Sequence, residues 1–166
     1  MKRREFIALI GGAAAPILWP LAARTQQAGR VPVIGLLGSS TAATQNAWVA
    51  EFTRRLRELG WFEGSNVAIE YRWAEGRLNR SPELIAELIR LKADVLVTHA
   101  TPNILAAKQA TSTIPVVFAL AGDPVGNNLV ASLARPGGNV TGLSMQQAET
   151  AGKRLELLRE IGRAHV

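Results

Sequence analysis

The chain has 166 residues, of which 48% are apolar and 19% charged, so its composition is that of one globular domain rather than a disordered segment. It has no cysteine, which excludes disulfides, thiol catalysis and cysteine-ligated metal sites. The formal net charge is +6, but no basic tract with interleaved aromatic residues follows residue 24, so nucleic-acid binding is not expected.

The first 23 residues have the pattern of a secretory signal peptide. Residues 2–4 are basic, and residues 6–23 are all apolar, Gly or Pro, with small residues near a possible cleavage site. The stretch RREFI resembles a twin-arginine signal, although Lys2 stands where Ser or Thr is usual. We therefore expect residues 1–23 to be removed and the mature protein to be periplasmic. The alternative is an uncleaved anchor, because the apolar stretch approaches the ~20 residues that span a membrane.

The first elements after this leader read as a strand, a helix and a second strand. Residues 31–38 (VPVIGLLG) form an apolar run typical of a buried central strand. A helix is expected over residues 45–59, with Gly60 as its stop. The apolar residues of this helix recur at helical spacing and share one face: Trp48, Phe52, Leu56 and Leu59. Residues 66–74 (NVAIEYRWA) alternate in polarity, which indicates a half-exposed strand near a sheet edge.

Two further helices are expected to begin with a capping hydroxyl followed by proline. Ser81-Pro82 starts the first of them, and Thr101-Pro102 starts the second, which ends near Ala110. Residues 94–99 (DVLVTH) between these helices read as another buried strand.

The remaining elements complete an alternating pattern. Residues 114–120 (IPVVFAL) predict a fourth strand, residues 123–134 a loop with a short helix, and residues 135–144 a turn and a fifth strand. Strands that alternate with helices favour an α/β fold. We therefore expect residues 31–144 to form a doubly wound parallel sheet of about five strands with helices on both faces.

Small and polar residues follow three of the predicted strands, at residues 38–41, 98–101 and 121–124. In open parallel sheets, ligands bind beyond the carboxyl ends of the strands, where the strand order reverses. Hydroxyls and helix N-termini attract a carboxylate, and Asp123 suits an ammonium group, so these clusters could hold a small zwitterion such as an amino acid. The alternative is that the same residues are simply helix caps.

Motifs for catalysis are absent from the sequence: it has no Gly-x-Gly-x-x-Gly, Walker loop, Gly-x-Ser-x-Gly elbow or His-Glu-x-x-His. His99, alone at a strand end, is expected to be structural or ligand-lining rather than a general base. Trp48, Trp61 and Trp73 are expected to pack in the core or between helix and sheet rather than to form a stacking platform. We expect a protein that is not an enzyme and has no catalytic residue, cofactor or metal site.

Several long stretches resemble the ABC-transporter substrate-binding proteins of the tryptophan/tyrosine-type group. They are the leader MKRREFI and the stretches GLLGSSTAATQNAWVAEFTRRLRELGWFEGSNVAIEYRWAEG, AAKQATSTIPVVFALAGDPVG, LVASLARPGGNVTGLS and AGKRLELLRE. The resemblance implies a type I periplasmic-binding fold, in which two lobes close on a small molecule and present it to a permease in the inner membrane. It also implies a monomer and an aromatic or branched amino acid as ligand.

The resemblance further implies that the loops after strands one, three and four contact the ligand. The positions to which these contacts map are Ser39, Ser40, Thr98, Ala100, Thr101, Asp123 and Pro124.

Members of this group carry a complete second lobe. Residues 145–160 match the first helix of that lobe, and residues 161–166 (IGRAHV) match what one frame of a common sequencing adapter encodes. We therefore expect a truncated chain with a non-native tail, which binds its ligand weakly; the alternative is a genuine short protein. The same fold also serves ligand-sensing modules that signal to a regulatory partner, and this remains the alternative function. A doubly wound enzyme would require a cofactor loop or nucleophile.

Overall fold

A computed structural model describes residues 30–145 and 147–163, and the structural findings concern these residues. The expected signal peptide over residues 1–23 lies outside them, as do residues 164–166 of the expected tail. Within the described ranges, no helix is both long enough and apolar enough to cross a membrane.

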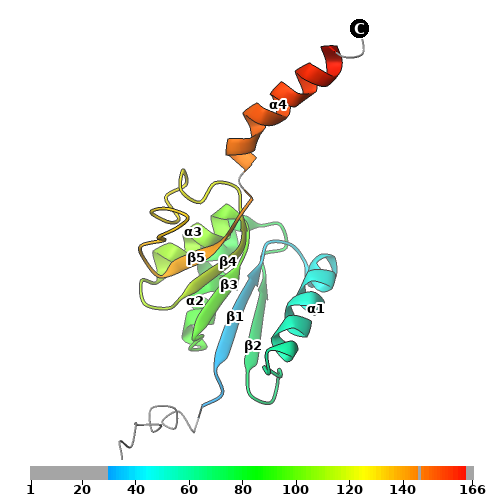
Figure 1. Cartoon of the computed structure of the whole chain (residues 1–166). Coiled ribbons are helices and arrows are strands. Elements are labelled where there is room, and N and C mark those ends of the chain that lie inside the picture. The colour runs from blue at the N-terminus through cyan, green and yellow to red at the C-terminus, as the bar shows by residue number, and fades with distance from the viewer. Residues whose placement is uncertain (1–29, 146, 164–166) are drawn as a thin grey trace, which may run out of the picture. The chain divides into compact units, whose positions relative to one another are not determined.

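Five parallel strands form one sheet (Figure 1). They are β1 (Val33–Gly38), β2 (Ala68–Trp73), β3 (Val95–Thr98), β4 (Val116–Ala121) and β5 (Val140–Ser144). Their order is β2-β1-β3-β4-β5, and every neighbouring pair is parallel. From β1 the chain moves to β2 on one side, and from β3 it moves to β4 and β5 on the other side. This path confirms the doubly wound sheet. The junction of β1 and β3, where the direction reverses, is its switch point. The alternating strand β2 lies at the edge, as expected.

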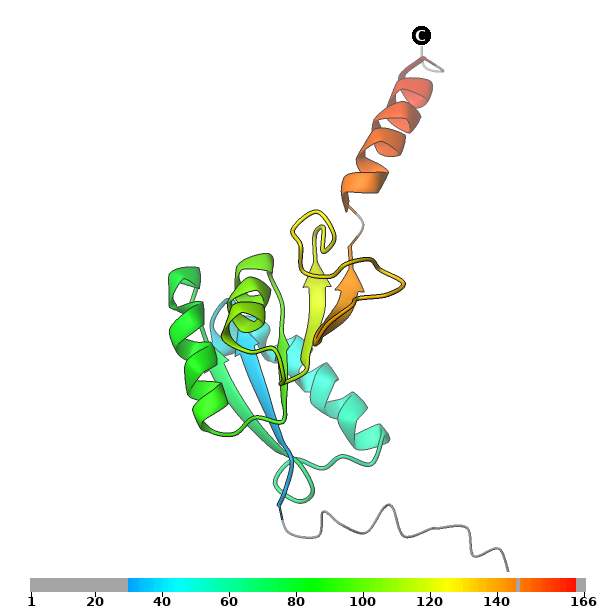
Figure 2. The same cartoon turned by 90° about the vertical axis from the view of Figure 1, so that its left-hand side faces the viewer.

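Helices cover both faces of the sheet (Figure 2). The helix α1 (Ala42–Glu58) lies on one face, and α2 (Ser81–Arg90) and α3 (Thr101–Ala110) lie on the other. This division follows from the right-handed crossovers, because connections that run in opposite directions along a parallel sheet place their helices on opposite faces.

The main core lies between the sheet and the α2–α3 layer. Its large members, each at most 2% exposed, include Ile85, Leu88, Leu96, Ile104 and Phe118. The opposite face is covered only in part, since α1 spans just one side of it.

This partial cover corrects the expectation that residues 94–99 form a buried strand, because only one face of β3 is buried. In β3, Leu96 is buried but Val97 is only half-buried, and in β4 Val117 is 37% exposed. Val97 and Val117 line an open apolar groove together with Phe52 of α1.

The helix α1 begins three residues earlier than expected and ends where expected. The Thr41 Oγ1 accepts a hydrogen bond from Thr44 N at 3.3 Å, which caps the N-terminus. At the other end, Gly60 has φ +86° and its N–H donates to Arg57 O at 2.9 Å. A Schellman turn of this kind requires a left-handed residue, which confirms Gly60 as the stop. Leu59 therefore leaves the apolar face and is 62% exposed.

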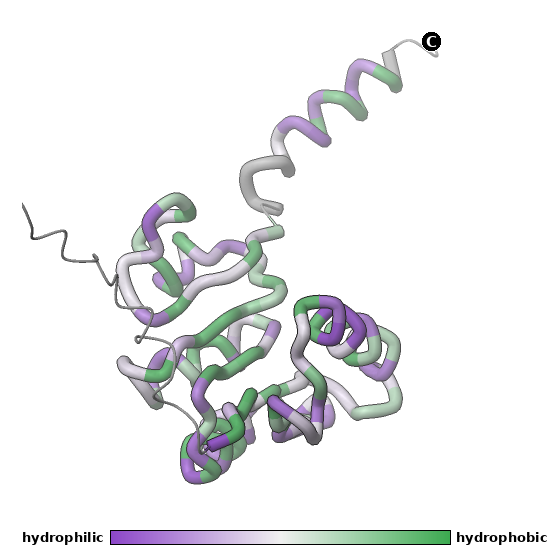
Figure 3. Tube along the Cα trace, turned by 60° about the horizontal axis from the view of Figure 1, so that its bottom comes forward, coloured by the Kyte–Doolittle hydropathy of each residue, from purple (hydrophilic) through white to green (hydrophobic). Residues whose placement is uncertain are grey.

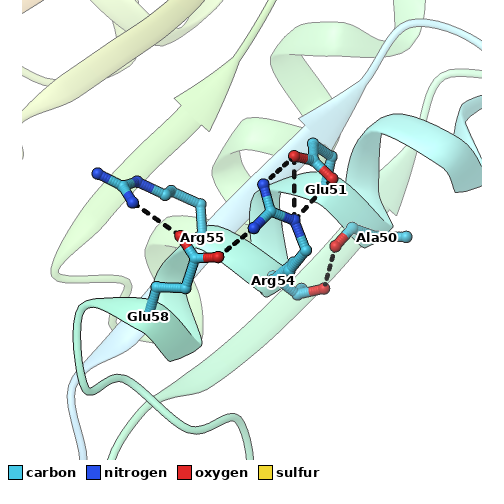
Figure 4. A network of polar contacts seen from close by, with 6 residues as sticks. Ala50, Glu51, Arg54, Arg55 and Glu58 are labelled. Carbon is cyan, nitrogen blue, oxygen red and sulfur yellow. Dashed lines mark hydrogen bonds and ion pairs between the residues drawn. The ribbon is translucent and has the colours of Figure 1, made fainter.

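The outer face of α1 carries a network of ion pairs (Figure 4). Arg54 donates to Glu51 and Glu58, and Arg55 donates to Glu58 at 2.7 Å. The hydrogen bond to Arg54 lowers the pKa of Glu51, and the Glu51 carboxylate raises the pKa of Arg54. All four side chains are 43–65% exposed, so solvent screens these pairs and they serve mainly to keep this helix face polar.

The expected capping roles of Ser81 and Thr101 are wrong. Ser81 is the first residue of α2 and Thr101 the first residue of α3, and neither helix has a side-chain cap. A 3₁₀ turn over Leu78–Arg80 leads directly into α2, so Ser81 is already helical and fully buried. Its Oγ lies 2.7 Å from Leu78 O and 2.6 Å from Asn103 Oδ1, and it joins α2 to α3 instead of capping.

The short helix expected within residues 123–134 is also wrong, because this segment consists of turns and bends. One helical hydrogen bond forms, from Asn127 N to Asp123 O at 3.1 Å. The left-handed φ of +53° at Asn128 then stops propagation. Burial of Leu129 and Val130 anchors the loop to the core without a helix.

The helix expected over residues 145–160 is observed as α4 (Gln147–Arg163). It includes the first three residues of the expected tail. The helix carries both hydrophilic and hydrophobic residues along its length (Figure 3). Its large apolar side chains are 57–64% exposed: Leu155, Leu157, Leu158 and Ile161. Two expectations stay predictions: that α4 starts a second lobe, and that residues 161–166 are non-native.

Candidate ligand-binding site

The carboxyl ends of β1 and β3 meet at the switch point of the sheet. Leu37 of β1 pairs with Thr98 of β3, so the residues that follow, Ser39 and His99, leave the sheet side by side. This junction is where doubly wound sheets bind ligands. The structure thus brings together the first two of the three clusters that the sequence singled out.

His99 lies at the centre of this junction. Its Nε2 atom is 2.6 Å from Gln45 Nε2, 3.4 Å from Ser39 N and 3.5 Å from Ser39 Oγ. The ring of Trp48 meets the imidazole edge to face, with ring centroids 4.9 Å apart. Burial lowers the pKa of His99 below its ordinary value, because the charged form loses hydration. The neutral imidazole is therefore favoured at neutral pH.

Gln45, in the first turn of α1, connects the two loops. Its side chain is buried, and its Oε1 accepts a hydrogen bond from Ser40 N at 3.3 Å. The approach is possible because Gly38 has no side chain: a Cβ there would lie 2.2 Å from Gln45 Oε1 and 2.4 Å from the Trp73 ring. Glycine at position 38 is thus a steric requirement of this arrangement.

Thr98 holds the two central strands together. It is 1% exposed, and its Oγ1 donates to Leu37 O at 2.8 Å. This hydroxyl is committed to the sheet, so the structure gives it a role in joining β3 to β1. Contact between Thr98 and a ligand stays a prediction.

Ala100 has an unusual backbone conformation, with φ +68° and ψ +131°. Glycine alone adopts this region without strain, and strained residues concentrate at functional sites. Ala100 is the N-cap of α3, and Thr101, half-buried, begins the helix. The backbone conformation of Ala100 turns the chain from β3 into α3, so that the N-terminus of α3 lies at the switch-point edge.

We expect Ala100→Gly to stabilise the protein by about 1 kcal/mol, because glycine relieves the strain and this outweighs the greater chain entropy of the unfolded state. Urea denaturation measures the change. The matched control is Ala86→Gly within α2, where φ is helical and a loss of about 1 kcal/mol is expected. If Ala100→Gly destabilises as much as Ala86→Gly does, the strained conformation is not present.

Asp123 and Pro124 follow β4, which lies next to β3, so they stand at the same edge of the sheet. The Asp123 side chain is exposed, and its Oδ1 accepts from Gly126 N at 2.8 Å. Pro124 is buried, and its carbonyl accepts from Leu129 N at 2.8 Å. These contacts of Asp123 and Pro124 are local to their own loop, whereas the loops after β1 and β3 contact each other directly. Ligand binding by all seven expected residues stays a prediction.

Sequence reasoning missed Gln45 and assigned Trp48 to core or helix–sheet packing. The same expectation is wrong for Trp61, which is 43% exposed. The spacing contained a clue, because Gln45, Trp48 and Phe52 share one face of α1. A polar residue at the N-terminal end of an apolar stripe is placed to meet the strand ends, and Gln45 does so. The expectation that His99 is structural or ligand-lining fits its observed position.

The chain matches known proteins over most of its described length. Residues 41–162 match the family described as ABC transporter substrate binding protein. Among curated proteins, a tyrosine-binding protein of Clostridioides difficile (strain R20291) is 32% identical over 110 residues, which are 66% of this chain and 31% of that protein.

Solved structures agree with this match. A conserved domain protein from Vibrio cholerae is 34% identical with a TM-score of 0.64 and covers 69% of this chain and 39% of its own. An ABC domain in complex with L-Trp from Streptococcus pneumonia is 31% identical with a TM-score of 0.63 over the same shares of the two chains. The ligand-free, open structure of a substrate-binding protein with adhesive properties from Clostridium difficile is 27% identical, has a TM-score of 0.63, and covers 70% of this chain and 41% of its own.

The chain therefore spans less than half the length of each of these relatives, and what it matches is one lobe. Its parallel sheet, its switch-point cluster and the match over residues 41–162 lead to the same conclusion. The chain belongs to the family of ABC transporter substrate-binding proteins.

Proposed function

We propose that this protein is the solute-binding component of an ABC importer, which captures an amino acid in the periplasm and delivers it to an inner-membrane permease. Residues 31–144 form the first of two lobes that close on the ligand. The protein is exported by its leader, acts as a monomer and performs no catalysis. The observation that carries the proposal is the convergence of the loops after β1 and β3 on His99 in a chain of this family.

The chemistry of the edge suits an amino acid. The hydroxyls of Ser39, Ser40 and Thr101 and the N-terminus of α3 provide donors for a carboxylate. The exposed carboxylate of Asp123, one strand further along, provides the opposite charge for an ammonium group. An aromatic amino acid is the leading ligand, since one relative is named for tyrosine and another was solved with L-Trp.

The test is a thermal-shift screen of the purified chain against L-tryptophan, L-tyrosine, L-leucine and, as a control solute, ribose. At about 100 times its dissociation constant, a ligand stabilises the folded state by ~2.7 kcal/mol, so tryptophan or tyrosine should raise the melting temperature clearly. Asp123→Asn should weaken binding by about tenfold or more, since the ammonium loses its counter-charge. A shift by ribose with none by any amino acid would contradict the proposal.

The two-lobe part of the proposal has its own test. One lobe offers only half of the cleft wall, so the chain should bind tryptophan much more weakly than its two-lobed relatives do. Titration calorimetry on this chain and on the Streptococcus relative compares the two affinities. Equal affinities would contradict capture between two lobes.

A further inference from the structure

The hydrogen bonds around His99 fix the protonation state of its ring. The Ser40 N–H donates to Gln45 Oε1, so the amide of Gln45 is oriented with its Nε2 toward His99. An amide Nε2 is a donor only, and Ser39 N, also directed at His99, is a second donor. The His99 Nε2 atom must therefore accept, which places the ring proton on Nδ1 and leaves the imidazole uncharged.

We propose that Gln45 and His99 are positioning residues, which hold the loops after β1 and β3 in their ligand-binding arrangement only while the imidazole is neutral. The Gln45–His99 pair spans 54 residues of sequence and joins α1 to the end of β3. Gln45 holds Ser40 through its Oε1, and His99 holds Ser39, so one side-chain pair sets both serines of the first loop. The consequence for ligand affinity rests on the function proposed above.

Protonation of His99 would place an N–H at Nε2, 2.6 Å from another donor. The groups that face the ring are Gln45 and Trp48 from α1 and Ser39 from the β1 loop, and none of them carries a charge. Within the described part of the chain, the one acceptor that these groups offer to a protonated Nε2 is Ser39 Oγ, at 3.5 Å, and this long contact does not offset the donor–donor clash with Gln45 Nε2 at 2.6 Å. Burial acts in the same direction, since it lowers the pKa of His99.

The stability that neutral His99 contributes is lost on acidification. Because the folded-state pKa lies below the unfolded value of about 6.5, the unfolded chain binds the proton first as pH falls. The stabilisation by neutral His99 is complete above about pH 6.5, and it is lost as the pH falls through the folded-state pKa of His99. The loops should therefore loosen on acidification.

Two variants test the Gln45–His99 pair. Gln45→Glu places a carboxylate where it accepts from Ser40 N as before but now also accepts from a charged imidazolium, so the pKa of His99 should rise above its ordinary value. His99→Gln keeps an acceptor oxygen near the position of Nε2 and removes the titration, so it is the conservative control.

The first measurement needs no ligand. Long-range ¹H–¹⁵N NMR of the full chain reports the tautomer and pKa of His99, whose signal is the one lost in His99→Gln. At about pH 7.5 the wild type should show an unprotonated Nε2, and its His99 pKa should lie below about 6.5. Gln45→Glu should raise the pKa of His99 above about 6.5. A protonated Nε2, or a pKa unmoved by Gln45→Glu, overturns the proposal.

The second measurement is titration with L-tryptophan at about pH 7.5 and at one unit below the His99 pKa that NMR gives. The wild type should lose affinity about tenfold at the lower pH, whereas His99→Gln should change by less than about twofold. Equal loss in both proteins overturns the positioning role, because the loss then comes from other groups. If tryptophan binds neither protein at either pH, the proposed ligand is wrong, while the NMR result still decides the state of the pair.

Discussion

Phe118→Ala is expected to lower the free energy of unfolding by about 3–5 kcal/mol. Phe118 is 2% exposed and is among the largest side chains of the core between the sheet and the α2–α3 layer. Its removal costs the transfer free energy of the ring and leaves a cavity that neighbours such as Ile104 fill only in part. Domains of this size are stable by only about 5–15 kcal/mol, so the variant should be close to unfolding. Urea denaturation followed by circular dichroism measures the change.

Leu143→Ala is the matched control, since Leu143 stands in the adjacent strand β5 and is 69% exposed. Its loss should cost less than about 0.5 kcal/mol, because little apolar area leaves the interior. Equal effects of the two substitutions would show that the inner and outer faces of β4 and β5 have been exchanged.

The fold follows from patterns that act over short distances. The apolar run that became β1 requires two covered faces, and such a strand lies inside a sheet. Polar and apolar residues alternate around Ile69, so this strand needs one solvent-exposed face, which places β2 at the edge of the sheet. Gly60 stops α1 because no side chain opposes a left-handed residue there. Strand order and handedness then follow from chain order, since right-handed crossovers leave few arrangements.

The predictions of local structure are wrong where a distant contact or an unusual backbone conformation outweighs a local preference. Ser81 has the propensity of a cap, but the buried interface with Asn103 takes its hydroxyl, and Leu78–Arg80 supply the turn before the helix. Residues 123–134 have helical composition in part, yet Asn128 adopts a left-handed conformation and the chain turns. Neither the contact of Ser81 with Asn103 nor the left-handed conformation of Asn128 could be inferred from neighbouring residues.

The site was predicted in outline and missed in detail for the same reason. Strand ends followed by polar residues indicate an edge, and the structure brings Ser39 and His99 together there. The Gln45–His99 contact depends on the rotation of α1 relative to the sheet, which periodicity alone does not fix. Gly38 reads as the end of a strand in the sequence, and its steric role appears only with Gln45 and Trp73 in place.

Gly38→Ala is expected to destabilise the protein by about 1–3 kcal/mol, as overpacking of a tight interior does. A Cβ at position 38 would lie 2.2 Å from Gln45 Oε1 and 2.4 Å from Cε3 of Trp73, so at least one of these side chains must move. Displacement of Gln45 breaks its bonds to Ser40 N and to His99 together. Binding of L-tryptophan should therefore fall by about tenfold or more, beyond what the loss of stability alone explains.

The control for this substitution is Gly122→Ala, at the end of β4 on the same edge of the sheet. A Cβ at position 122 meets no atom within 4 Å, so neither stability nor affinity should change measurably. The NMR signal of His99 separates the two variants further, since only Gly38→Ala should shift the ring toward an ordinary histidine pKa by freeing it from Gln45. If both alanines leave His99 unmoved, the close approach of α1 to β1 does not set the site, and the arrangement of its polar residues must come from the loops alone.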